Sequence, residues 1–480
     1  MRIRNFIIAM TALTATATAA AQSWNDKVKK SVLKITTYKA DGSVIGTSNG
    51  FYLSDDGVAT AAYAPFKNAQ KAIVSDTKGK EYPVTMILGA NDMYDVVKFK
   101  VDNNKASGLQ TAKAAPSEGQ KLYVMHYSTS HVNPREGSIT KAETFRDTYK
   151  YYTFTANPVA DSGGSPVLNS NGEAVGMMQG DGTDMGYALD INFIKDLKMG
   201  ALSINDATLR GIAIPKDIPE DYTQAQVALY MAANASEDIY QQTIDLFISR
   251  FPDKPEGYKA KAELDYMRNN FKGAEDDLAQ AEKYTTDKAE IHSQRAKLIF
   301  QKNTFKSDVS YPDWTMDKAL QECITANSIS PQPLYIYQKA ELLFAMQRYR
   351  ESVQAFNEYK GMMGDNVDHQ FYFGRYQAEL QAKLYQQALA DIDSAITKNS
   401  SMPTYRAEKA NLQYRLGQFD DAINTAEDCL SQYADYSDVH LILGLSRIRK
   451  GQKAEGLASL RKAQELGNPQ AAALIEKYSR

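Results

Sequence analysis

The sequence predicts a multidomain protein in which an all-β N-terminal region precedes an all-α region of helical repeats. Three observations lead to this prediction. The chain has 480 residues, too many for one hydrophobic core. Short strand-like runs fill residues 31–199, whereas apolar residues recur at helical spacing beyond residue 219. Within the second part, similar segments recur every 34 residues, which is typical of a repeat architecture.

Composition describes an ordinary globular protein, with 43% hydrophobic and 24% charged residues. The formal net charge is only -3, so the whole chain offers no strong field for nucleic acid or an anionic membrane, and we expect no nucleic-acid partner. The cysteines and histidines form no cluster with the spacing of metal ligands. The sequence therefore predicts neither a metal site nor a cofactor.

The N-terminal segment reads MRIRNFIIAMTALTATATAAAQS, with Arg2 and Arg4 before a short apolar run that ends in alanines. This is the pattern of a secretory signal peptide, here residues 1–21, with cleavage near Ala21 or Gln22. The run is too short, and too rich in threonine, for a membrane-spanning helix. We therefore expect an exported protein, periplasmic or secreted, without a transmembrane segment.

Two cysteines occur in the chain, Cys323 and Cys429. They fall about three repeats apart, on second helices at positions that are otherwise apolar. Because a disulfide needs α-carbons within roughly 7 Å, the spacing predicts two buried free thiols.

The strand-like runs are rich in β-branched and aromatic residues, and several are separated by glycine-containing turns. Many short strands over this length predict a sandwich or a pair of barrels. The runs are SVLKITTY, NGFYLSDDGVAT, KAIVSDTKGKEYPV, DVVKFKV, KLYVMHYS, KYYTFTA and EAVGMM.

The helical part repeats one local theme, an aromatic residue followed three positions later by a small residue where the second helix of a hairpin begins. It occurs in NNFKGAEDDL, QRYRESVQAF, KLYQQALADI and GQFDDAINTA. Phe271 and Phe305 are 34 residues apart, as are Tyr385 and Phe419. This period, with small residues at the helix crossing, resembles the tetratricopeptide repeat.

The resemblance implies a solenoid over residues 223–480, preceded by a linker at 201–222. The third repeat is longer than the others, and SDVSYPDWTM is expected between its two helices. The repeats are predicted at 223–256, 257–290, 291–334, 335–370, 371–404, 405–438 and 439–472.

The β region, residues 22–200, resembles the trypsin-like superfamily, in particular its bacterial HtrA-like branch. Four blocks in the same order as in the family carry the resemblance, which implies a chymotrypsin-like double β-barrel. The blocks are SNGFYLSDDGVATAAYAPFKNA, GANDMYDVVKFKV, DSGGSPVLNSNGEAVGM and MGYALDINFIKDL.

The position of the family's catalytic histidine holds Tyr63, in TAAY. A phenol with a pKa of about 10 stays protonated at neutral pH and has no second ring nitrogen that an aspartate could orient. The orienting acid is retained as Asp95. No histidine precedes His126, and we expect His126 and His131 to be surface or packing residues. The residues therefore predict a triad without its base.

The nucleophile turn can be paired with the family in two ways. Counting back six positions from Asn169 places Gly163 at the nucleophile position, without a gap. The alternative makes Ser162 the nucleophile and treats Ser165 as an insertion. We favour the ungapped pairing, because an insertion distorts the turn whose amides form the oxyanion hole.

These residues favour a pseudoprotease whose cleft binds an extended peptide without cleaving it. Two alternatives stay open at this point. The barrels could be a scaffold without a ligand, or the chain could be a serine endopeptidase that uses Ser162 with a base other than histidine, its repeats recruiting substrate.

The repeats imply a long concave groove that binds a protein or peptide partner. Basic residues recur at one place of the first helices, at intervals of 34, 44, 36 and 34. They either form a basic ladder for an acidic ligand or pair with acids of adjacent helices. The residues are Lys261, Arg295, Lys339, Arg375 and Lys409.

Overall fold

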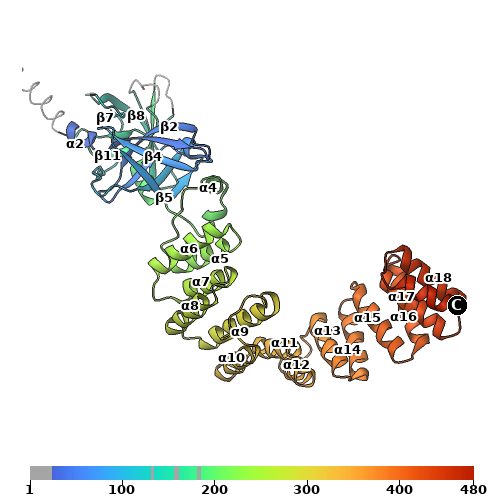
Figure 1. Cartoon of the computed structure of the whole chain (residues 1–480). Coiled ribbons are helices and arrows are strands. Elements are labelled where there is room, and N and C mark those ends of the chain that lie inside the picture. Colours follow the sequence, from blue (N-terminus) through green and yellow to red (C-terminus); the bar gives the residue numbers. More distant parts are fainter. Residues whose placement is uncertain (1–23, 131–133, 156–161, 181–184) are drawn as a thin grey trace, which may run out of the picture. The chain divides into compact units, whose positions relative to one another are not determined.

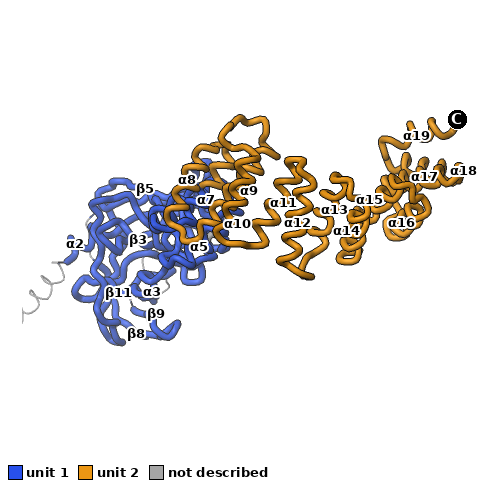
Figure 2. The backbone as a smooth tube through the Cα atoms, turned by 90° about the horizontal axis from the view of Figure 1, so that it is seen from below, with its two compact units in different colours: residues 1–261 blue, residues 262–480 orange. Residues whose placement is uncertain are grey.

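The computed structural model describes residues 24–130, 134–155, 162–180 and 185–480 (Figure 1). The predicted signal peptide and His131 lie outside these ranges. The chain divides into two compact units, residues 1–261 and 262–480, which Figure 2 distinguishes by colour. Each unit is described by itself. The first predicted repeat, 223–256, lies within the first unit.

The first barrel is closed, with antiparallel strands in the order β1-β2-β3-β6-β5-β4. Alternating side chains of β1 point into it, so Leu33 and Ile35 are fully buried beside Val74 and Phe99. The strands are β1 (Val32–Tyr38), β2 (Val44–Tyr52), β3 (Val58–Ala61), β4 (Lys71–Asp76), β5 (Glu81–Asn91) and β6 (Val96–Val101). The short helix α2 (Asn25–Lys29) precedes these strands in the sequence, and η1 (Ala64–Phe66) lies between β3 and β4.

The second barrel is also closed and antiparallel, in the order β10-β11-β12-β9-β8-β7. Its strands are β7 (Lys121–Val124), β8 (Arg135–Phe145), β9 (Tyr149–Phe154), β10 (Pro166–Leu168), β11 (Ala174–Gln179) and β12 (Gly186–Asp190), with α3 (Ile191–Asp196) after them. The sequence did not predict β8, because two of its eleven residues are buried and the rest lack apolar alternation. Pairing with both β7 and β9 makes it a strand.

Residues 197–221 follow the barrels and pack onto the first one. Leu209, Ile212 and Ile214 are buried in the core of the first barrel, and Lys216 forms a parallel bridge to Ile87 of β5. Arg250 of α6 donates to Asp217 at 2.7 Å, which attaches the first helical hairpin to this segment. The short helices here are η2 (Ser203–Asn205) and α4 (Ala207–Arg210).

The helical part forms seven consecutive hairpins and a final helix, each hairpin lying at one of the predicted repeats. The pairs are α5 (Tyr222–Ala232) with α6 (Glu237–Arg250), α7 (Pro255–Met267) with α8 (Phe271–Tyr284), α9 (Lys288–Phe305) with α10 (Met316–Ile329), α11 (Pro333–Ala345) with α12 (Tyr349–Met363), α13 (His369–Gln381) with α14 (Tyr385–Lys398), α15 (Pro403–Arg415) with α16 (Phe419–Gln432), and α17 (Ser437–Arg449) with α18 (Lys453–Glu465), followed by α19 (Ala471–Ser479). The double barrel and the helical repeats confirm the predicted fold class.

The repeated small residue explains how the two helices of a hairpin approach. Ala274, Ser352, Ala388 and Ala422 are all fully buried at the start of a second helix. The Ser352 hydroxyl donates to the Ala340 carbonyl oxygen of the preceding helix at 2.8 Å, so even the polar member of the set is satisfied. A larger side chain at these positions cannot fit without separating the helices.

Other features of the helical part concern its cysteines and its surface. Cys323 and Cys429 are free and buried, as predicted.

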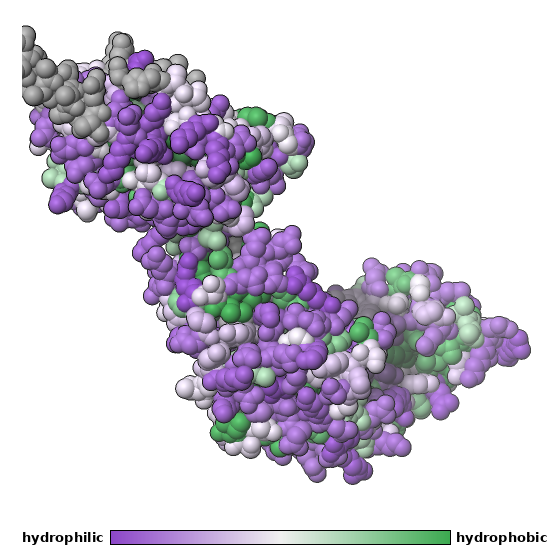
Figure 3. Space-filling model, turned by 60° about the vertical axis from the view of Figure 1, so that its left-hand side comes forward, coloured by the Kyte–Doolittle hydropathy of each residue, from purple (hydrophilic) through white to green (hydrophobic). Residues whose placement is uncertain are grey.

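Within the described ranges, every helix is too short or too polar to cross a membrane. Hydrophilic side chains cover most of the face in Figure 3, and smaller hydrophobic patches lie between them.

Candidate functional site

A cleft of about 540 Å³ is lined by residues of both barrels. From the first barrel it receives Ser48, Asn49, Ala62, Ala64 and Asp95, and from the second His126, Tyr127, Gly163 and Gly180. The cleft therefore brings together the turn after β3, the turn before β6 and the turn before β10. These are the segments in which the sequence placed the base, acid and nucleophile positions. Segments 156–161 and 181–184 lie outside the described residues.

Tyr63 is turned away from this cleft, although its neighbours Ala62 and Ala64 line it. Its ring is 6% exposed and packs in the core of the first barrel. The hydroxyl donates to the Thr208 carbonyl oxygen at 2.6 Å. Burial raises the pKa of Tyr63, and the negative charges of Asp92 and Asp206 add to the shift. The phenol is therefore a protonated donor, and this geometry leaves it unable to take a proton from a group in the cleft.

Asp95 lines the cleft in a left-handed backbone conformation, with φ of 43°. Its Oδ1 accepts a hydrogen bond from the Ala64 backbone nitrogen at 2.7 Å. The retained acid therefore contacts the main chain next to position 63. The Asp95 carboxylate stabilises the turn after β3, whereas the Tyr63 hydroxyl donates to the Thr208 carbonyl oxygen.

The turn before β10 presents glycine to the cleft. Gly163 lines the cavity, and its carbonyl oxygen accepts from the Asn49 backbone nitrogen at 3.2 Å. Gly164 has φ of 85°, and a β-carbon there would lie 2.1 Å from the Asn49 carbonyl oxygen. This position requires glycine, because a side chain would clash with β2.

Both serines of the turn point inward. Ser162 is 2% exposed and Ser165 is fully buried, and neither lines the cleft. Their hydroxyl oxygens have no hydrogen-bond partner among the residues that the structure describes. A nucleophile needs both access to substrate and a base within hydrogen-bond reach, and among the described residues neither hydroxyl has a hydrogen-bonded base or a place on the cleft wall.

His126 is a cleft residue that the sequence reading missed. It follows β7 and lines the same cavity as Asp95. Burial lowers the pKa of His126, and the positive charge of Arg135 lowers it further, which favours the neutral imidazole. No local signal distinguished it from a packing residue, because its position in the wall depends on how the two barrels meet.

The basic residues of the first helices are engaged by acids. Lys339 pairs with Glu358 at 3.1 Å, and Lys409 pairs with Asp393 at 2.6 Å. Arg375 donates to both carboxylate oxygens of Asp391, at 2.6 and 2.8 Å. Lys261, in the first unit, is half-buried. Pairing with acids of adjacent helices is therefore the geometry found at these three residues.

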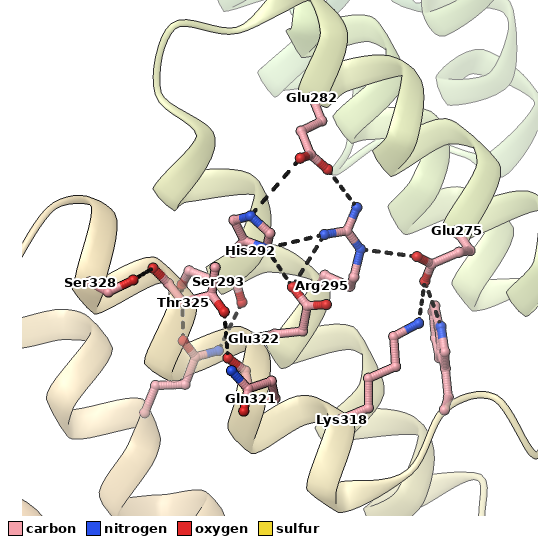
Figure 4. Close-up of polar contacts among 12 residues, drawn as sticks. Glu275, Glu282, His292, Ser293, Arg295, Lys318, Gln321, Glu322, Thr325 and Ser328 are labelled. Carbon is pink, nitrogen blue, oxygen red and sulfur yellow. Dashed lines mark hydrogen bonds and ion pairs between the residues drawn. The ribbon is translucent and has the colours of Figure 1, made fainter.

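Arg295 is the most buried of the five basic residues, with 5% exposure. Its guanidinium group contacts Glu275 and Glu282 at 3.1 Å and Glu322 at 3.2 Å (Figure 4). His292 approaches Glu322 at 2.6 Å on the same side. One cation thus joins carboxylates from α8 and α10, which makes it a structural centre of the repeats and leaves it unavailable to a ligand.

Comparisons with known proteins agree with this architecture. The model of the trypsin-like peptidase domain matches residues 48–177, and that of the tetratricopeptide repeat matches residues 408–471. No curated protein matches the chain.

Similar solved structures include the Rv3671c protease from M. tuberculosis in its active form, with 16% identity and a TM-score of 0.31 over 40% of this chain and 85% of that one. Another is the serine endoprotease from Yersinia pestis, with 17% identity and a TM-score of 0.31 over 36% of this chain and 67% of that one. On the family matches, residues 48–177 are similar to the trypsin-like peptidase domain and residues 408–471 to the tetratricopeptide repeat.

Proposed function

We propose that this chain is an exported protein that binds protein or peptide segments and does not hydrolyse them. The observation that carries the proposal is the direction of three side chains in the peptidase domain. Tyr63 points into the barrel, and the hydroxyls of Ser162 and Ser165 are buried, so the cleft wall offers glycine at the turn before β10. A bound peptide meets a surface without an activated nucleophile.

Peptide binding by the cleft is supported by its size and its polar groups. A volume of about 540 Å³ accommodates several residues of an extended chain. Backbone groups of the wall and the side chains of Asn49, Asp95 and His126 supply donors and acceptors. The repeats add a second surface, since solenoids of this kind bind partners along their concave side.

Export rests on the N-terminal sequence, whose residues lie outside the described ranges. Arg2 and Arg4, the apolar run and the alanines before Gln22 support a cleaved signal peptide. Mass spectrometry of the protein from its native compartment tests this. We expect a mature N-terminus near residue 22 in the periplasm or medium, and an intact Met1 in the cytoplasm would contradict it.

A second candidate function is a serine endopeptidase that uses Ser162. The observation that favours it is the presence of His126 and Asp95 on the same cleft. It requires the Ser162 hydroxyl, now 2% exposed, to turn outward.

A fluorophosphonate probe separates the two functions. We expect no labelling of the full chain under conditions in which trypsin is labelled completely. Labelling that disappears in both Ser162→Ala and His126→Ala, and persists in Ser165→Ala, would establish the peptidase and exclude our proposal.

A further inference from the structure

A recess of about 450 Å³ lies on the second unit, lined mainly by the first helices α11, α13 and α15 of three successive hairpins. These helices follow one another along this unit in Figure 1. Six of its thirteen lining residues are aromatic: Phe300, Tyr337, Phe344, Phe356, Phe373 and Tyr405. The rings pack on each other: the Phe373 and Tyr405 centroids are 4.9 Å apart, and those of Tyr337 and Phe356 are 5.6 Å apart. The walls are therefore held in place before any ligand arrives.

One charged side chain lines this recess, that of Glu341. Among the described residues, its carboxylate has neither a hydrogen bond nor an ion pair. The side chain reaches solvent, yet burial by the surrounding protein raises the pKa of Glu341. Its charge is also felt by the nearby phenol, because burial together with Glu341 and Asp368 raises the pKa of Tyr337 to about 12.

Two basic residues of the helices that line this recess, Lys339 and Arg375, contact acids other than Glu341. Lys339 pairs with Glu358, and Arg375 makes its two-pronged contact with Asp391. Glu341 is therefore a solvent-exposed carboxylate beside aromatic rings, and Lys339 and Arg375 contact other acids. A carboxylate in this setting is complementary to a basic side chain, which can pair with the charge and stack on the rings.

We propose that this recess binds the side chain of a lysine or arginine from a partner peptide, with Glu341 as the ion-pairing group and the surrounding rings as the walls. Ring faces attract cations, and the attraction grows when both are shielded from water. The aliphatic stem of the same side chain packs on the rings. This inference rests on the proposed function, because it assumes that the repeats bind peptides. It adds that the bound peptide carries a lysine or arginine that occupies this recess.

Other side chains fit the recess less well. An acidic residue would be repelled by Glu341, since like charges at close range oppose each other. A purely apolar residue would fill the volume but leave the carboxylate further desolvated without a partner. A basic residue satisfies the charge and the apolar walls together.

The experiment is a selection from a displayed library of random twelve-residue peptides against the full chain, repeated with Glu341→Gln and with the matched control Glu358→Gln. Glu341→Gln keeps the shape and removes the charge. Glu358 is an exposed acid of the adjacent helix, already paired with Lys339. We expect one lysine or arginine position in the peptides selected by the wild type and the control, and no such preference with Glu341→Gln.

The selected peptide is then synthesised with N-acetyl and C-amide ends, as an arginine form and as a citrulline form. We expect wild type to prefer arginine by about tenfold or more, the range of close charge pairs at interfaces. The preference should vanish in Glu341→Gln and remain in Glu358→Gln. Phe344→Leu should weaken the arginine form more than the citrulline form, because it removes a ring and keeps an apolar side chain.

Each outcome has a separate meaning. Peptides without a basic position, or a preference for arginine unchanged in Glu341→Gln, would overturn this inference and leave peptide binding intact. A failure of the wild type to select any peptide would overturn both this inference and the proposed peptide binding by the repeats. Thermal unfolding of each variant, monitored by circular dichroism, verifies that it is folded.

Discussion

The hydroxyl of Tyr63 donates a 2.6 Å hydrogen bond to the backbone carbonyl oxygen of Thr208. This contact joins the turn after β3, where the family carries its catalytic histidine, to helix α4 in the segment that follows the barrels. The ring packs with Leu209 and Ile212 in the same core. Tyr63, at the position of the family's base, therefore attaches residues 203–214 to the first barrel, in the segment that leads to the helical hairpins.

Removing the Tyr63 hydroxyl tests this attachment. Tyr63→Phe should lower the stability of the first unit by about 0.5–1.5 kcal/mol, the net value of one hydrogen bond. Tyr63→Ala should lower it by about 3–5 kcal/mol, because the ring is buried. Hydrogen exchange measured by mass spectrometry should rise in residues 203–214. The control is Tyr230→Phe, whose ring is 73% exposed in the same unit. Equal exchange in Tyr63→Phe and Tyr230→Phe would contradict the prediction.

Restoring the family's histidine should not restore hydrolysis. In Tyr63→His the base is present, but Gly163 still lines the cleft and the Ser162 and Ser165 hydroxyls stay buried. We expect cleavage of a fluorescent casein substrate to equal that of the wild type. Activity in Tyr63→His that is lost in Tyr63→His with Ser162→Ala would instead mean that the turn can present Ser162.

Arg295→Met should strongly destabilise the repeats. It leaves Glu275, Glu282 and Glu322 without their shared cation, and removing one partner of a buried ion pair costs about 3–5 kcal/mol. The control Lys339→Met breaks one pair whose acid is half exposed, which is worth about 0–1 kcal/mol.

Trp314 offers a local signal for this comparison. It is 1% exposed, and its indole nitrogen donates to Glu275 at 2.8 Å. In a Trp24→Phe background its fluorescence is the sole tryptophan emission, since the chain has two tryptophans. Urea unfolding followed at this residue should shift to lower urea in Arg295→Met. Equal midpoints in Arg295→Met and Lys339→Met would show that the cluster is not a structural centre.

The stability of the second unit should fall as pH rises, through Glu379. This carboxyl group is 4% exposed, and burial together with the negative charge of Asp391 raises its pKa to about 8. The folded state then binds a proton that the unfolded state, with a pKa near 4.5, releases. Its contribution to stability is therefore full below the unfolded pKa and is lost as pH rises from about 4.5 through about 8.

Glu379→Gln keeps the neutral form at every pH. The difference in melting temperature, variant minus wild type, should increase between pH 5 and pH 9. The exposed Glu358→Gln should show no such trend over that interval. A flat difference for Glu379→Gln would mean that Glu379 titrates near its ordinary value.

The two thiols should be unreactive in the folded protein. Burial raises the pKa of Cys323 to about 12, and burial also raises the pKa of Cys429. Little thiolate is therefore present at neutral pH, and access is closed. A maleimide reagent should label neither cysteine in native buffer and both in 8 M urea, as counted by intact mass. Rapid labelling of either cysteine in native buffer would contradict its burial.

Local patterns predicted the division into a β region and helical repeats, and the resemblance to the trypsin-like family implied the double barrel and the place of the site. Runs rich in β-branched and aromatic residues predicted most strands. The aromatic and small residues at fixed spacing predicted the helical hairpins, because residues at one point of each repeat meet the same packing contact. Polar β8 was missed, since its partners on both sides make it a strand. The absence of a catalytic base at position 63 could likewise be predicted from the residue type, because a phenol is a poor base at neutral pH.

Tertiary structure decided where the side chains point and which charges meet. That Tyr63 reaches Thr208, that Ser162 and Ser165 face inward, and that His126 lines the cleft all depend on packing between segments distant in sequence. The same holds for Arg295, Lys339, Arg375 and Lys409, which pair with acids of neighbouring helices, and for Glu341, which has no ion pair among the described residues. Spacing places a residue on an element, and only the packing of elements assigns its partner.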